Sequence, residues 1–348
     1  MKHQFSKKNT LSMQKGLHPS IGFQKNTTVN ISIKRDDLKI MITALAGGVG
    51  AARFLTGLVK LVDEKDVSVI VNTGDDMDMF GLHISPDIDI VAYTLAGIVD
   101  EEKGWGIKGD TFQCLEMIKK LGLETWFSLG DKDFATHIFR TNLLNKGFTL
   151  SQVTDEICHA LGLKVTILPM TDDKFETWIK IEEGLVHFEE YFVKRQAKDK
   201  VLGVEFVGAA GAAHAKPSPK AVDSIVDAEM VVLCPSNPVV SIGTILSVDG
   251  IRDALKRTSA KVVGVSPIVA GAPIKGPADK LLRGLGFEVS AFSVAKLYAD
   301  FLDTFVIDIK DAGEKNQIEQ LGIKVKVTDT VMKSLEDKVR LAKTVLED

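Results

Sequence analysis

The segment 42–53, with the sequence ITALAGGVGAAR, limits most strongly the folds open to this chain. Its apolar run, glycine turn and following apolar residues at helical spacing predict a buried strand, a tight turn and a helix. In α/β proteins this arrangement binds phosphate, because glycines admit the ligand to the backbone and the helix N-terminus offers unpaired N–H groups. The turn matches neither G-x-G-x-x-G nor a Walker A motif, so taken alone it is equally consistent with a plain strand-to-helix connection.

An acidic loop follows the next predicted strand, residues 67–72. Its five carboxylates are Asp75, Asp76, Asp78, Asp87 and Asp89. Asp75 and Asp76 come directly after the strand, where carboxylate oxygens suit Mg2+. An anion site beside these acids indicates a nucleotide diphosphate held with a divalent cation, although acidic loops are also commonly just solvated. We expect either Asp87 or Asp89 to cap the next helix and the other to serve as a metal ligand or a general base.

Strand-like and helix-like segments alternate along most of the chain. The predicted strands are 40–45, 67–72, 164–169, 230–234, 262–266, 287–289 and 305–309, with a hairpin at 177–181 and 185–191. The predicted helices are 51–62, 89–99, 111–121, 134–145, 151–161 (with Ser151 as N-cap), 219–227 and 331–346. The apolar strands VVLC and VVGVS do not alternate with polar residues, as is typical of central parallel strands.

The fold class predicted from this order is α/β: a doubly wound, Rossmann-like, mostly parallel sheet with its ligand at the carboxyl ends of the strands. Residues 38–348 are expected to form one domain, with helices and a hairpin inserted at about residues 100–215. Residues 1–37 are expected to be a flexible basic extension, since the first 35 hold seven Lys or Arg and no acid. A β-hairpin arm through Thr28–Ile33 is the alternative, and a chain starting near Lys39 is expected to fold.

Composition excludes some classes of function. A net charge of -4 gives no general reason to expect nucleic-acid binding. No apolar run reaches the roughly 20 residues that span a bilayer. The three cysteines are scattered and odd in number, so we expect a reducing, cytoplasmic location.

Polar residues also follow later strands. In PSNPVVSIGT, Ser236, Asn237, Ser241 and Thr244 could read a base or bind phosphate, although turn chemistry alone explains Ser-Asn-Pro. The loop SPIVAGAPIKGP follows the next strand. Because the ends of parallel strands meet at one edge, the convergence of three such loops is the stronger indication of a site there.

The segment LGDKDFATHIFR predicts a turn followed by a helix with Asp133 as its N-cap. Lys132, His137 and Arg140 would face a polar substrate, or form a solvated face with a local ion pair. The other histidines, His83 among them, show no partner pattern and are interpreted as structural. Arg53, one turn into the first helix, is placed to reach back to a bound phosphate.

Taken together, the motifs ALAGGVGAARFLTGL, NTGDD, ISPDIDIVAYTLAG, GWGIKGDTF, LGDKDFATH, LPMTDD, PSNPVVSIG, SPIVAGAPIKGPADKLL and FLDTFVID resemble the 2-phospho-L-lactate transferase family of coenzyme F-420 biosynthesis. The resemblance runs from about Met41 to the C-terminus. It implies transfer of a phospho-lactyl or enolpyruvyl-phosphate group from a guanosine diphosphate-linked donor to the ribityl hydroxyl of the deazaflavin Fo. GMP leaves, Mg2+ is required, and a homodimer is expected; no nucleic acid or membrane is involved.

The resemblance also implies residue roles. The donor nucleotide would contact Gly47, Gly48, Val49, Gly50, Arg53, Ser236, Asn237 and Ser241. Fo would contact Asp89, Ser128, Lys132 and His137, and Mg2+ would bind Asp75, Asp76 and Asp87, with Asp75 and Asp89 as the catalytic pair. Many members carry Thr in place of Val49 and Lys in place of Arg53, and some archaeal members carry a basic residue in place of Ser128.

Two other classes compete with the transferase. A regulatory protein of the same fold that senses nucleotide sugars would share the glycine turn but lack the full SPDID and LGDKD set. An NAD(P) dehydrogenase would want G-x-G-x-x-G and a single acid ending the second strand. Here that strand ends in Asn72 and a carboxylate cluster follows, which disfavours the dehydrogenase.

Overall fold

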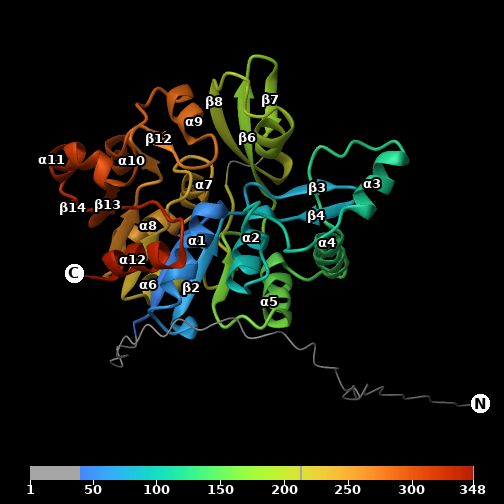
Figure 1. Cartoon of the computed structure of the whole chain (residues 1–348), viewed down its shortest axis with the longest axis horizontal. Coiled ribbons are helices and arrows are strands. Elements are labelled where there is room, and N and C mark those ends of the chain that lie inside the picture. Colours follow the sequence, from blue (N-terminus) through green and yellow to red (C-terminus); the bar gives the residue numbers. More distant parts are fainter. Residues whose placement is uncertain (1–39, 212–213, 348) are drawn as a thin grey trace, which may run out of the picture. The chain divides into compact units, whose positions relative to one another are not determined.

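The fold is built on a seven-stranded sheet (Figure 1). Every pair of neighbouring strands in this sheet is parallel. Its order is β14-β13-β10-β9-β1-β2-β5. The strands are β1 (Ile42–Ala46), β2 (Val67–Val71), β5 (Thr166–Pro169), β9 (Met230–Leu233), β10 (Lys261–Val265), β13 (Thr304–Asp308) and β14 (Lys324–Thr328). This computed structural model describes residues 40–211 and 214–347. The doubly wound α/β prediction is confirmed, and the predicted extension at 1–37, with its alternative arm, lies outside the described residues.

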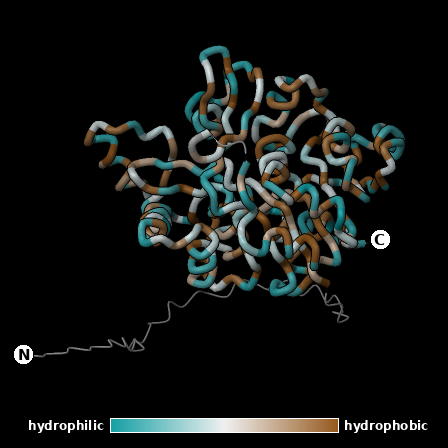
Figure 2. The backbone as a smooth tube through the Cα atoms, turned by 180° about the vertical axis from the view of Figure 1, so that it is seen from behind, coloured by the Kyte–Doolittle hydropathy of each residue, from teal (hydrophilic) through white to brown (hydrophobic). Residues whose placement is uncertain are grey.

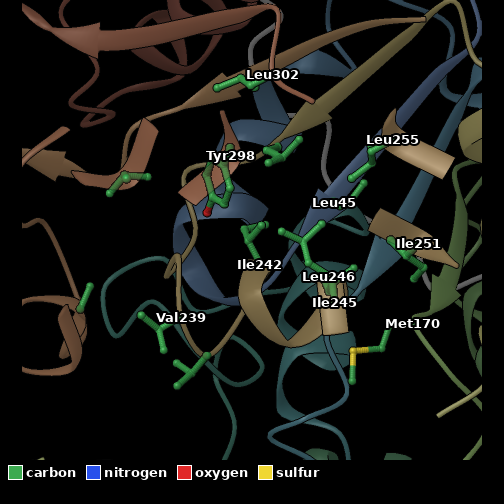
Figure 3. Close-up of a cluster of buried hydrophobic side chains, with 14 of the residues drawn as sticks. Leu45, Met170, Val239, Ile242, Ile245, Leu246, Ile251, Leu255, Tyr298 and Leu302 are labelled. Atoms are coloured by element: carbon green, nitrogen blue, oxygen red, sulfur yellow. The ribbon is translucent and has the colours of Figure 1, made fainter. Parts of the chain in front are cut away.

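Helices cover both faces of the sheet because its strands are apolar on both sides. One face packs against α1 (Gly48–Leu58), α2 (Pro86–Leu95), α5 (Leu150–Ala160) and α12 (Leu335–Leu346). The other packs against α6 (Ala221–Val226), α7 (Ile242–Ser247), α8 (Ile251–Arg257), α9 (Ala278–Gly284), α10 (Ala291–Tyr298) and α11 (Lys315–Glu319). Figure 3 shows part of this second core, where Leu45 of β1 lies among side chains of α7, α8 and α10. In Figure 2 apolar stretches run through the body that holds the sheet.

Two excursions leave the sheet near β2 and β5. The first holds the hairpin β3 (Met77–Met79) and β4 (Leu82–Ile84), then α3 (Gln113–Lys120) and α4 (Asp131–Leu144). The second is an antiparallel sheet of β6 (Phe175–Ile181), β7 (Gly184–His187) and β8 (Gly203–Gly208). Since β5 lies between them and pairs with β2, the predicted insertion at 100–215 is two segments rather than one. A short hairpin, β11 (Ile268–Val269) and β12 (Ala272–Pro273), follows β10.

Three local predictions outside the candidate site were wrong. The predicted strand at 287–289 is a loop between α9 and α10, since β13 already occupies the edge of β10. Helix α5 is capped by Thr149, which forms a capping box with Gln152, rather than by Ser151. The predicted second arm of the hairpin ends at His187 and turns into a π-helical segment, and the third strand β8 has no equivalent among the predictions.

Candidate active site at the carboxyl ends of β1, β2 and β9

The glycine turn lies where the strand order changes direction. From β1 the chain builds outward to β2 and β5 on one side, and to β9 and β10 on the other, so the topological switch point falls between β1 and β9. Here the N–H of Gly47 donates to Ser236 Oγ (3.2 Å), and the N–H of Gly48 donates to Asp87 Oδ1 (2.8 Å). The turn is thus joined to the loop after β9 and to the start of α2.

Close packing explains why this turn is rich in glycine. A Cβ on Gly47 would lie 2.6 Å from Ser241 Cβ and 2.7 Å from Asp87 Oδ2. A Cβ on Gly50 would lie 2.3 Å from the carbonyl oxygen of Pro235. Only glycine lets the first turn of α1 approach the loop after β9 this closely.

Gly50→Ala is expected to lower the free energy of unfolding by about 1–3 kcal/mol, because the added methyl group meets a backbone atom that cannot move aside cheaply. Urea unfolding followed by circular dichroism measures this loss. Gly313→Ala is the matched control, since a Cβ there meets nothing within 4 Å. Equal stabilities for the two variants would contradict the close approach of α1 to Pro235.

Three of the predicted carboxylates gather beside the turn, and a fourth joins them from elsewhere. Asp75, Asp76, Asp87 and Glu189 are each 5–6 % exposed. Burial raises the pKa of Asp75 well above its ordinary value, and the charges of Asp87 and Glu189 raise it further. Burial raises the pKa of Asp87 to about 6, and burial with the charge of Asp87 raises that of Glu189 to about 8. We call these four residues the acidic cluster.

Glu189 is the functional candidate that sequence reasoning missed. It follows β7, more than 100 residues after Asp75, and the excursion of β6 and β7 brings it to that carboxylate. Its neighbour Glu190 makes the pair look like an ordinary solvated surface. Only its place after an apolar residue at the end of a hairpin could have drawn attention to it.

A hydrogen-bond network holds the acidic cluster in place. Asn72 Nδ2 donates to Asp87 Oδ2 (2.9 Å), while Asp76 Oδ2 accepts from Ser85 Oγ (2.7 Å) and lies 3.1 Å from His83 Nε2. Burial disfavours a charged His83, but its bond to Asp76 outweighs this and raises the pKa of the ring. His83 therefore has an acidic partner that the sequence did not reveal.

The cluster has the properties that a divalent cation requires. Oδ1 of Asp75 and Oδ1 of Asp76 are buried and lack a hydrogen-bond partner among the described residues. Hard carboxylate oxygens are the preferred ligands of Mg2+, and a cation would offset the mutual repulsion that raises these pKa values. The residues present thus fit Mg2+.

Asp89 is paired with an arginine and is not part of the acidic cluster. Its carboxylate forms a bidentate ion pair with the fully buried Arg140, one bond of which spans 3.1 Å. Arg140 Nη1 also lies 3.2 Å from Nδ1 of His137, and the hydroxyl of Tyr93 donates to Asp133 Oδ1 (2.9 Å). The prediction that Asp87 or Asp89 caps α2 was wrong, since Ser85 is the N-cap residue and both carboxylates bond elsewhere.

A second group could hold a metal ion. Ligand atoms of Asp89, Asp133 and His137 all lie within 4.8 Å of one another. Burial lowers the pKa of His137 to about 4 and, with the charge of Asp89, raises that of Asp133 to about 7. Arg140 already supplies a positive charge to Asp89, and the pair links α2 to α4, whereas His137 Nε2 is buried without a hydrogen-bond partner among the described residues. His137, expected to contact a substrate, is only 1 % exposed.

The segment around Lys132 is explained by reciprocal capping. Asp110 accepts from the backbone N–H of Lys132 (2.9 Å) at the start of α4, and Asp131 accepts from that of Cys114 (2.9 Å) at the start of α3. Lys132 Nζ donates to the carbonyl of Gly109 (3.3 Å). The predicted cap at Asp133 was wrong, because Gly130 is the N-cap residue of α4.

Of the other residues predicted to contact a substrate, some lie at the glycine turn and others do not. Ser236 and Ser241 are buried against Gly47, whereas Asn237 Oδ1 accepts from the N–H groups of Val239 and Val240 and closes its own turn. Ser128 is exposed.

A cavity of about 380 Å³ opens beside Asp76 and His83. Its walls include Phe148 and Phe175. None of the four residues that the resemblance assigned to Fo lines this cavity.

Fold and site together define a Rossmann-like α/β protein whose glycine turn adjoins a carboxylate cluster. The profile of the family described as 2-phospho-L-lactate transferase CofD matches residues 42–345. The chain belongs to this family, and it is therefore an enzyme of the transferase class. Among the described residues, no helix has the length and apolarity needed to cross a membrane.

Several curated relatives are similar to this chain over nearly their whole length. The phosphoenolpyruvate transferase of Streptomyces griseus is 44% identical over 88% of this chain and 97% of its own. The 2-phospho-L-lactate transferase of Methanosarcina mazei is 40% identical over 87% and 98%, and that of Methanocaldococcus jannaschii is 42% identical over 88% and 97%. Protein BH3568 of Bacillus halodurans shares the fold, with a TM-score of 0.59, 17% identity, and coverage of 88% of this chain and 99% of that one.

Proposed function

We propose that this transferase moves a 2-phospho-lactyl or enolpyruvyl-phosphate group from a guanosine diphosphate-linked donor to the ribityl hydroxyl of Fo, releasing GMP. The observation that carries the proposal is the bond from Gly48 N–H to Asp87, which joins the anion-binding turn to the acidic cluster. A diphosphate at the turn would lie beside the carboxylates that hold its cation. Phosphoryl transfer needs this combination of positioning and charge neutralisation.

The donor is assigned to the glycine turn and the loop after β9. Backbone N–H groups at the start of α1 and the Arg53 guanidinium would face the diphosphate. Ser236, Asn237 and Ser241 would face the guanosine. Ser236 Oγ already accepts from Gly47, so it would fix the turn as well.

Mg2+ is assigned to Asp75, Asp76, Asp87 and Glu189, the last being an addition to the predicted set. When bound, the cation neutralises charge on the transferred phosphoryl group. Asn72, Ser85 and His83 hold these carboxylates through the bonds described above, so the ligands are oriented before substrate arrives.

The acceptor is assigned to the side of α2 and α4, where Asp89, Ser128, Lys132 and His137 lie. Arg140 keeps the Asp89 carboxylate in one orientation, which suits a group that positions a hydroxyl. Because His137 is buried and neutral, its role there is to support Asp89 through Arg140. The enzyme is further proposed to act as a cytoplasmic homodimer on small molecules.

Mg2+ is expected to stabilise the protein more near pH 8 than near pH 5. The pKa values of Asp87 and Glu189, raised to about 6 and about 8, mean that their contribution to stability is complete at low pH and is lost as pH rises through those values. A cation replaces the lost protons, so the increase in Tm on adding Mg2+ to the chelator-treated protein grows with pH. Differential scanning fluorimetry measures this, and Glu189→Gln should reduce the difference between the two pH values. An increase in Tm that is the same at both would refute the assignment.

The proposed reaction is tested with purified protein, Fo, Mg2+ and either the lactyl or the enolpyruvyl diphospho-guanosine donor. Mass spectrometry follows GMP and the phosphodiester product. Product with one donor establishes the activity and identifies the three-carbon group. GDP binding without product from either donor would favour the regulatory class.

A further inference from the structure

Two cationic side chains meet beside the glycine turn. Arg53 belongs to α1, and Lys275 lies in the loop between β12 and α9. A Cβ on Gly104 would lie 2.7 Å from Lys275 Nζ, 4.0 Å from Nη2 of Arg53 and 3.7 Å from Cγ1 of Val49. Three segments far apart in the sequence therefore bring both cations to one point, next to a residue of the turn itself.

Neither cation is neutralised there. No hydrogen bond or ion pair joins the side chain of Arg53 or Lys275 to an acid within residues 40–211 and 214–347. Partial burial and the charge of Arg53 lower the pKa of Lys275, and no carboxylate offsets them. By contrast, Arg140, Lys194 and Arg195 each face a carboxylate.

An exposed lysine without a ligand role would avoid a second cation, because like charges repel and solvent is available. The ammonium group of Lys275 instead lies on the side of its loop that faces Arg53 and the turn. A guanidinium and an ammonium group that converge beside the N-terminus of a helix form an arrangement that holds phosphate oxygens.

We propose that Lys275 and Arg53 form a two-cation subsite for the diphosphate of a nucleotide, with Lys275 as a binding residue. The guanosine nucleotide as natural ligand rests on the proposed function; the diphosphate subsite itself does not. Gly104 forms the wall of the subsite. Its φ of 78° and its lack of a Cβ leave the space that the ammonium group occupies.

Titration calorimetry with inorganic diphosphate, GDP and guanosine, all in Mg2+, tests the subsite. Lys275→Met is expected to weaken binding of diphosphate and GDP by about tenfold, the loss of one charged hydrogen bond, and to leave guanosine unchanged. Lys275→Arg should retain most of the affinity. Lys60→Met, at an exposed lysine just beyond the end of α1, removes the same charge and should change nothing.

A second readout does not require a change of residue. Under limiting reductive methylation, excess diphosphate should protect the Lys275 amine, while the Lys60 amine in the same digest reacts at an unchanged rate. Peptide mass spectrometry measures both. Equal reactivity of Lys275 with and without diphosphate would overturn the subsite.

The outcomes separate this inference from the proposed function. If the wild-type protein binds diphosphate but not GDP, and Lys275→Met binds diphosphate more weakly, the subsite is supported and the guanosine donor is overturned. If the wild-type protein binds both ligands and Lys275→Met binds them with unchanged affinity, the subsite is overturned and the donor assignment stands. Absence of binding of either ligand by the wild-type protein overturns both.

Discussion

Asp75→Asn is expected to lower turnover by about 10²–10³-fold while the protein stays folded. The amide keeps the shape of the side chain but loses the charge that would hold a cation, and with it the electrostatic stabilisation of the transferred phosphoryl group. In chelator the variant should melt at a higher temperature than the wild type. Burial and the charges of Asp87 and Glu189 raise the pKa of Asp75, so its carboxylate at neutral pH opposes folding.

Asp78→Asn serves as the control for this experiment. Asp78 lies three residues further along, in β3, but its side chain is 65% exposed and faces His83 and Lys174 at the surface. Its loss should leave both turnover and Mg2+-dependent Tm unchanged. Steady-state kinetics and scanning fluorimetry on both variants decide the matter. Near-normal turnover by Asp75→Asn would remove Asp75 from the metal site.

Arg140→Met is expected to lower the free energy of unfolding by about 3–5 kcal/mol, because it leaves the buried Asp89 carboxylate without its counter-ion. Urea unfolding measures this loss of stability. The double variant Arg140→Met with Asp89→Leu should recover part of the stability, since a well-packed apolar pair can replace a buried ion pair.

Arg340→Met provides the matched comparison. Arg340 pairs with Asp337 on α12, where its side chain is 41% exposed, so the loss should be at most about 1 kcal/mol. A similarly small loss in Arg140→Met would show that the contact between α2 and α4 does not depend on this ion pair.

The fold could be predicted because its signals are local. Apolar strands such as 230–233 and 261–265 and the helical spacing after the glycine turn identify the elements, and parallel topology then places their carboxyl ends at one edge. The strand at 287–289 was wrong because a short apolar run carries no information about which sheet edge is free.

The site could be predicted only where its residues follow strands. Gly48, Asp75 and Asp87 do, and the structure joins them through short loops. Glu189 reaches the acidic cluster only through tertiary folding, and the bond of Asp89 to Arg140 spans 51 residues. No spacing rule links such pairs, so sequence alone could not say that one carboxylate joins the cluster while another pairs with a buried arginine.

A crystal structure of the protein with GDP and Mn2+ in place of Mg2+ tests the account most directly, because anomalous scattering locates the cation independently of the protein. We predict one strong peak in contact with carboxylates of the acidic cluster, and diphosphate density at Gly47–Gly50 within reach of Arg53. A peak between Asp89, Asp133 and His137, or nucleotide density away from the glycine turn, would contradict it.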